Sequence, residues 1–198
     1  MAGVVTDSIR TEFLSNCFQM TEQCYQESKM LLEENRRQIL LKTVKEIKKT
    51  MEILVKQYED KKASGEIGEL KYVFFSFLRT GIVRTGTWYR VDYYDMRERI
   101  SLVECGSKLE LSEILSPWYE STYKLRKVFG KQTRVKEYEL DYMLYQMAER
   151  YQPLVACLLE DAVRESLNER GRTWFGEERV EFWQGEYMDK ARCFYCWE

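Results

Sequence analysis

The first 64 residues carry a helical pattern of apolar positions. No glycine or proline interrupts the chain between Gly3 and Gly65, so this window contains no residue that breaks a helix. Apolar residues recur there with steps of three and four, the spacing of one stripe on a coiled-coil-like helix. This heptad seam consists of Leu40, Val44, Ile47, Met51, Leu54 and Tyr58.

A polar run from Glu33 to Arg37 interrupts the apolar series. We therefore predict two helices, over residues 7–33 and 37–62, folded as a hairpin, with a single kinked helix as the alternative. Because the stripe covers only one side of the helix, it needs a partner surface. The predicted domains are a helical arm of residues 1–64 and an α+β body of residues 65–198, with one continuous domain over 1–198 as the alternative.

Residues 71–95 are rich in aromatic and β-branched side chains, which are typical of strands. Residues 88–93 alternate with period two, which indicates a strand with one wetter face. Residues 84–87 predict a turn around Gly86, and residues 100–104 predict a third strand. Together these segments predict a small antiparallel sheet.

Helical patterns return after Ser112. Ser116 and Pro117 read as a helix start, and Gly130 as its end. A second helix over residues 135–151 carries tyrosines at helical spacing. Pro153 starts or kinks another helix, which ends at Gly171. The aromatic residues from 174 onward predict a terminal hairpin. The fold class is therefore α+β and predominantly helical.

Composition favours a soluble cytoplasmic protein. The 198 residues include 44% hydrophobic and 32% charged side chains, with a net charge of −2, a mixture that argues against disorder. The longest runs without a charge have nine residues, too short for a membrane span, and the first ten residues lack a secretory signal. Six cysteines form no regular disulfide framework.

The chain has no histidine, which excludes His-dependent nucleophilic catalysis and zinc sites with imidazole ligands. It also lacks glycine-rich phosphate loops, so we expect no cofactor. Cys193 and Cys196 have the spacing of a metal-binding pair, but a structural zinc needs two more ligands. We interpret them as ordinary cysteines, with a metal site as the minor alternative.

Carboxylates lie on or beside the predicted sheet at Asp92, Asp95 and Glu104, with Lys108 nearby. Metal-dependent enzymes use such residue types on adjacent strands. The tight acid-x-lysine spacing of that chemistry is absent, so a carboxylate or metal-dependent enzyme is the weakest of three hypotheses.

The segment from Ser121 to Lys136 contains six bases and no acid. Such a run between helices can bind phosphates in a salt-sensitive way. Nucleic-acid association is therefore the second hypothesis. Its candidate residues are Lys124, Arg126, Lys127, Lys131, Arg134 and Lys136.

The preferred hypothesis is a non-catalytic interaction protein that binds another protein, or a second copy of itself, through amphipathic helices. Tyrosine suits a contact face because its ring is apolar and its hydroxyl stays wet. The candidate contact residues are Leu40, Val44, Ile47, Met51, Leu54, Tyr138, Tyr142 and Tyr145.

Overall fold

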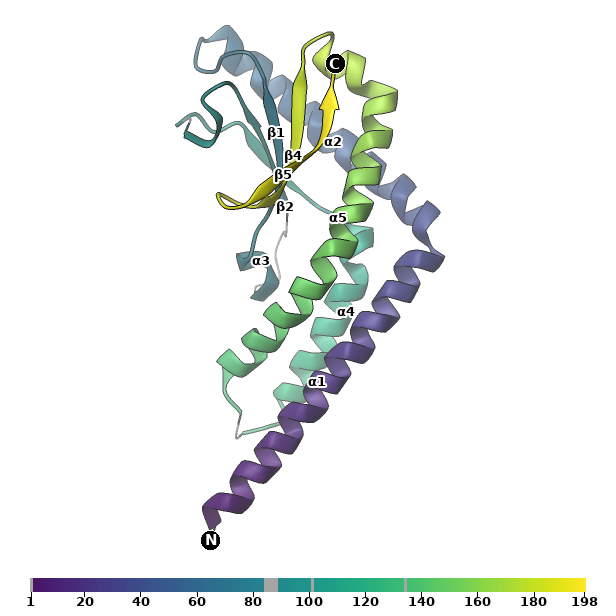
Figure 1. The fold of residues 1–198 in the computed structure, drawn as a ribbon, viewed down its shortest axis with the longest axis vertical. Coiled ribbons are helices and arrows are strands. Elements are labelled where there is room, and N and C mark those ends of the chain that lie inside the picture. Colours follow the sequence, from purple (N-terminus) through teal and green to yellow (C-terminus); the bar gives the residue numbers. More distant parts are fainter. Residues whose placement is uncertain (1, 84–88, 101, 134) are drawn as a thin grey trace. The chain divides into compact units, whose positions relative to one another are not determined.

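The computed structural model describes residues 2–83, 89–100, 102–133 and 135–198 (Figure 1). The chain is α+β and mostly helical, as predicted. It forms two compact units, one built from the chain up to Ile39 with Glu113–Val155, the other from Leu40–Ser112 with Ala156–Glu198. This division differs from the predicted arm and body, because two long helices each continue from one unit into the next.

The N-terminal half of the helical pattern forms two helices, α1 (Ala2–Glu34) and α2 (Arg36–Ala63), as predicted. They are separated by Asn35 alone. The Asn35 backbone N–H donates to the Leu31 carbonyl, and the Ile39 N–H donates to the Asn35 carbonyl. The Asn35 side chain donates to the same Leu31 carbonyl over 3.0 Å, an alternative to the helix ladder that suits a helix end.

The first unit is a helical bundle of α1, α4 (Ser112–Phe129) and the beginning of α5 (Glu137–Phe175) (Figure 1). Aromatic side chains join the three helices. Phe13 meets Phe129 with ring centroids 5.4 Å apart, and Trp118 lies 5.8 Å from Tyr151. The Tyr151 hydroxyl donates to the Ile114 carbonyl over 2.7 Å, so a buried polar group is satisfied inside the bundle.

The second unit contains a five-stranded sheet in the order β3-β2-β1-β4-β5. Its strands are β1 (Tyr72–Phe77), β2 (Tyr89–Tyr94), β3 (Gly106–Leu109), β4 (Val180–Glu186) and β5 (Ala191–Trp197). The short helix α3 (Thr80–Val83) and a 3-10 turn (Glu98–Ile100) lie between strands in sequence.

The sheet is mixed, which corrects the expectation of a purely antiparallel one. The first three strands pair antiparallel, but β1 pairs parallel with β4 and thereby joins the terminal hairpin to the same sheet. Parallel strands need a long crossover connection, and here more than a hundred residues separate β1 from β4. Local sequence patterns carry no trace of such a pairing.

One face of the sheet packs against helices of the same unit. Tyr93 on β2 donates a hydrogen bond to the Met51 sulfur over 3.6 Å and lies edge-on to Tyr58. Phe175 near the end of α5 packs against Phe182 on β4 with ring centroids 5.6 Å apart. The core of this unit is therefore aromatic as well as aliphatic.

The third strand lies later in the chain than predicted. Residues 98–100 form the 3-10 turn, and β3 begins at Gly106. Asp95 explains the delay, because its carboxylate accepts the Arg97 backbone N–H over 2.9 Å and bends the chain directly after β2. The predicted turn at 84–87 and Trp88 lie outside the described residues.

Two C-terminal helices form where three were predicted. Helix α4 begins at Ser112, ahead of the predicted start at Ser116, and ends before Gly130 as predicted. Helix α5 continues through Pro153, although proline removes one helical hydrogen bond. Buried side chains on both sides of Pro153, such as Tyr151 and Val155, hold the helix together through packing.

Gly171 is a packing glycine instead of the predicted helix end. A Cβ at this position would lie 2.6 Å from the Trp197 ring, so only glycine permits this approach. The helix ends before Gly176, whose φ of +58° is the left-handed conformation that closes many helices. Among the described residues, no helix has the length and apolarity required to cross a membrane.

Candidate functional site

The heptad seam of α2 is mostly buried within the chain. Val44, Ile47, Met51 and Leu54 are buried, and Leu40 is partly exposed. Tyr58 at the end of the seam accepts the Leu70 backbone N–H over 2.8 Å. Tyr58 is buried as well, so the seam supplies the chain's own core, and a partner cannot reach its five buried members while the fold is intact.

The tyrosine stripe of α5 lies on the surface of the first unit. Tyr138, Tyr142 and Tyr145 are 66%, 56% and 37% exposed. Their spacing places them on one helix face, while the next residues round the helix, such as Leu144 and Met147, are buried. Of the predicted contact residues, these tyrosines are the exposed ones, and Leu40 is partly exposed.

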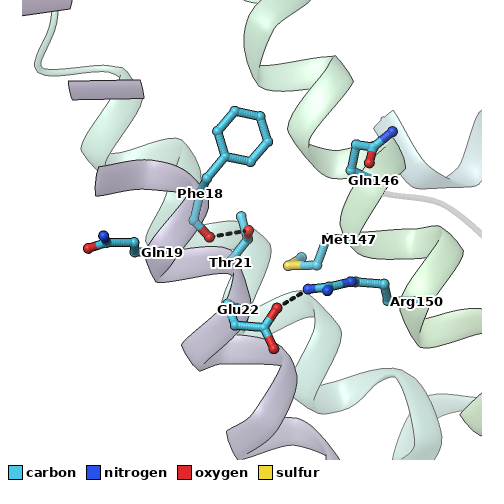
Figure 2. A pocket seen from close by; sticks show the side chains of 7 residues that line it. All are labelled: Phe18, Gln19, Thr21, Glu22, Gln146, Met147 and Arg150. Atoms are coloured by element: carbon cyan, nitrogen blue, oxygen red, sulfur yellow. Dashed lines mark hydrogen bonds and ion pairs between the residues drawn. The ribbon is translucent and has the colours of Figure 1, made fainter. Parts of the chain in front are cut away.

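An open groove lies beside this stripe, between α1 and α5 of the same unit. Its volume is about 420 Å³. Phe18 at one end of the groove is 41% exposed and lies edge-on to Tyr142, with ring centroids 6.4 Å apart. The groove and the tyrosine stripe therefore form one continuous surface. Figure 2 shows the groove with its lining residues, Phe18, Gln19, Thr21, Glu22, Gln146, Met147 and Arg150.

Ion pairs hold α1 against α5 along this groove. Glu22 and Arg150 reach toward each other across it, as Figure 2 shows. The Arg150 guanidinium also lies over the Tyr25 ring, 5.8 Å from its centroid. Arg10 pairs with the buried carboxylate of Glu139. These contacts fix the helix that presents the tyrosines.

Sequence reasoning missed the groove residues on α1. Apolar residues follow one another with helical spacing on α1 at Phe13, Cys17, Met20 and Cys24, and the two cysteines among them are buried. Phe18 directly follows Cys17 in the chain, so an aromatic residue one position away from the apolar series was the signal available in the sequence.

The basic segment is spread over α4 and the chain after it. Lys124 is exposed and lies 3.8 Å from Glu27, while Lys127 and Lys131 are exposed. Tyr123, 68% exposed, lies one turn before Lys127. Lys136 is exposed, Arg126 is partly buried, and the predicted residue Arg134 lies outside the described residues.

A polar cluster on the sheet brings together two of the three predicted carboxylates. Arg90 on β2 donates to Asp92 Oδ1 over 2.6 Å and also to the Glu104 carboxylate. Its guanidinium lies over the Tyr187 ring, 5.4 Å from the centroid. Gly106 lies opposite Asp92 in the sheet, and a Cβ there would come within 2.1 Å of Asp92 Oδ1.

The Asp92 carboxyl is only 2% exposed, and burial raises its pKa to about 6 although the hydrogen bond from Arg90 lowers it. Its Oδ2 atom has no hydrogen-bond partner among the residues that the structure describes. A proton on this carboxyl therefore relieves the cost of burying a charge.

Asp95 lies in a different setting from Asp92. It accepts hydrogen bonds from the Arg97 side chain and from the Gly68 backbone N–H at 2.8 Å. The Arg97 guanidinium lowers the pKa of Asp95 to about 2. Lys108 is exposed on β3. The three predicted carboxylates are therefore divided between two hydrogen-bonded groups. Asp92 and Glu104 share Arg90, and Asp95 bonds with Arg97.

Cys193 and Cys196 lie on β5, opposite Trp183 and Glu181 of β4. Burial raises the pKa of the Cys193 thiol, which disfavours the thiolate that binds metals. Across the described part of the chain, no group of three or more cysteine or acidic side chains could hold a metal ion.

Comparison with known proteins found no protein-family model, no curated protein and no solved structure that matches this chain.

Proposed function

We propose that the chain is a non-catalytic protein that binds another protein through the first unit. The contact surface is the tyrosine stripe of Tyr138, Tyr142 and Tyr145 together with the groove between α1 and α5. The observation that carries this proposal is the exposure of three tyrosines in a row on a helix whose other side is buried. Tyrosine is enriched at protein interfaces because it offers apolar area with little loss of side-chain freedom.

The charged cluster on the sheet supports a non-catalytic role. Arg90 donates hydrogen bonds to both Asp92 and Glu104, so these charged groups already have partners inside the fold. A cytoplasmic location is part of the proposal, since all six cysteines are free of disulfides, as is usual in reducing compartments.

Quantitative affinity capture from the native host tests the protein-binding role. The variant Tyr138→Ser/Tyr142→Ser/Tyr145→Ser should lose at least one protein that the unchanged chain retains. The matched control is Met96→Ser/Leu102→Ser, which removes two exposed apolar side chains from the second unit. If both variants retain the same proteins as the unchanged chain, the tyrosine stripe is not a contact surface.

Nucleic-acid binding is the second candidate function, favoured by the exposed Tyr123 one turn from Lys127 on α4. A ring beside a cation can stack a base while the cation binds phosphate. A labelled single-stranded oligonucleotide should then bind in a salt-dependent way, and Lys127→Glu/Lys131→Glu should flatten that dependence. Unchanged affinity in this variant would exclude the segment as the binding site.

A further inference from the structure

The first unit carries opposite charges on two helices that follow each other in the chain. Helix α4 and the turn after it present Lys124, Lys127 and Lys131 to solvent. The stretch from Glu137 to Glu149 at the beginning of α5 then contains four acids and no base. One bundle therefore has both a basic face and an acidic face.

The acids of α5 lie beside the tyrosine stripe. Tyr138, Asp141, Tyr145 and Glu149 follow one another with steps of three, four and four, which places them on one side of the helix. Glu149 is exposed and Asp141 is partly exposed. We call Glu137, Tyr138, Asp141, Tyr142, Tyr145 and Glu149 the acidic tyrosine face.

Within the described part of the chain, the carboxylates of this face are not neutralised by ion pairs. Arg10 pairs with Glu139, which is buried and lies outside the acidic tyrosine face. Neither Asp141 nor Glu149 forms an ion pair with any other residue that the structure describes. The face therefore offers carboxylates and ring faces together, a combination that suits a surface of lysines.

The basic face of α4 has the matching character and spacing. Lys124 and Lys127 lie three residues apart on α4, Lys131 follows in the turn after Phe129, and Tyr119 and Tyr123 are exposed on the same helix. Of these lysines, Lys124 lies at the edge of ion-pair distance from Glu27, an exposed and weak contact. The two lysines of α4 and the lysine in the following turn can therefore form several charge pairs with the carboxylates of a neighbouring helix.

We propose that the acidic tyrosine face binds the basic face of α4 on a second copy of this chain. This inference rests on the proposed function, because it names the protein that the tyrosine stripe contacts. Each copy supplies both faces, so a two-fold axis makes the contact reciprocal and doubles the number of charge pairs. A single exposed pair or a single lysine over a ring contributes little, and only such repetition gives a stable dimer.

Charge reversal with complementary mixing tests this dimer. The basic-reversed variant is Lys124→Glu/Lys127→Glu/Lys131→Glu, and the acid-reversed variant is Glu137→Lys/Asp141→Lys/Glu149→Lys. Light scattering coupled to size exclusion measures the mass of each alone and of an equimolar mixture. The unchanged chain should be dimeric. The dissociation constant of the dimer should rise at least about tenfold in each variant alone, because like charges then meet. The mixture should recover the dimer.

A matched control reverses three lysines on the second unit, Lys45→Glu/Lys49→Glu/Lys56→Glu, and should stay dimeric. Circular dichroism confirms that all variants remain helical. A mixture that stays monomeric overturns the proposal, because complementary charge is its basis.

The outcomes also separate this inference from the proposed function. If the unchanged chain is monomeric and affinity capture still depends on the three tyrosines, the partner is a different protein. The inference that a second copy binds the tyrosines is then wrong. If the chain is monomeric and capture is independent of the tyrosines, the proposed function fails as well. A dimer that survives both reversals places the contact elsewhere and overturns the inference.

Discussion

The two units place the same residue type in opposite environments. Tyr89 and Tyr93 on β2 are fully buried, whereas Tyr138 and Tyr142 on α5 are more than half exposed. The sheet uses tyrosine rings as core, packed between strands and helices. In the bundle Tyr151 is likewise buried beside Trp118, whereas the three tyrosines of the stripe remain in solvent.

The charged groups differ between the units in the same way. The second unit encloses the carboxyls of Asp92 and Asp95 and pairs each with an arginine. The first unit leaves Glu149 and Lys127 on the surface. The second unit therefore depends on these buried rings and buried charged groups for its stability, whereas the tyrosine stripe, Glu149 and Lys127 of the first unit lie on the surface.

The largest expected effect is the difference in the free energy of unfolding between a substitution at a buried tyrosine and one at an exposed tyrosine. Tyr93→Ala should reduce the free energy of unfolding by about 3–5 kcal/mol, because it leaves a cavity and removes the contacts with Met51 and Tyr58. Tyr142→Ala should change it by less than about 0.5 kcal/mol. Urea denaturation measures both. Equal losses would mean that the exposed tyrosine also belongs to a core.

The pH dependence of stability should reveal the buried Asp92. Its pKa is raised from 3.8 to about 6 in the folded chain, so the protonated form favours folding. This contribution is complete below about pH 4 and disappears as the pH rises through 6, a change of up to about 3 kcal/mol. Asp92→Asn should flatten the unfolding free energy over this range. An unaltered pH profile in this variant would show that Asp92 titrates normally.

Glycine substitutions compare close packing in the two units. Gly106→Ala places a Cβ against Asp92 and Arg90 and should cost about 1–3 kcal/mol. At Gly130, in the first unit, the nearest atom to an added Cβ is the Arg126 carbonyl oxygen at 3.4 Å. Gly130→Ala should therefore change stability by about 0.5 kcal/mol or less. Thermal denaturation distinguishes them, and a neutral Gly106→Ala would contradict the close contact with Asp92.

Asp95 should show the opposite sign of pH dependence from Asp92. Its pKa is lowered from 3.8 to about 2, so its contribution is present above pH 4 and is lost as the pH falls through 2. Because Arg97 is half-exposed, solvent screens the pair, and we expect Asp95→Asn to cost about 1–2 kcal/mol at neutral pH. Acid titration of unfolding in both asparagine variants checks the two signs side by side.

Local patterns predicted the helices of the N-terminal half because residues 7–62 contain no glycine or proline and break only at Asn35. They also predicted the antiparallel start of the sheet from alternation on β2. They failed at Pro153, where the helix continues between the buried Tyr151 and Val155, and at Gly171, which packs against the Trp197 ring instead of ending the helix.

The candidate surface was predictable only in part. The spacing of the tyrosines on α5 was visible in the sequence. It places them on one face of the helix, and that face is the exposed one. The groove was not visible, because it requires Phe18 and Arg150 from segments more than a hundred residues apart. The heptad seam was visible in the sequence, but its burial was not. A regular apolar stripe does not reveal whether its partner surface lies in the same chain or in another protein.

Site-specific photocrosslinking tests the contact role of the tyrosine stripe most directly. The photoreactive residue p-benzoylphenylalanine replaces Tyr142, or, as a control, the exposed Met96 of the second unit. Irradiation in the native host should join the chain through position 142 to a discrete protein, either a second copy or another partner, and not through position 96. The absence of any adduct at position 142, or equal adducts at both positions, would contradict a contact role for the tyrosine stripe.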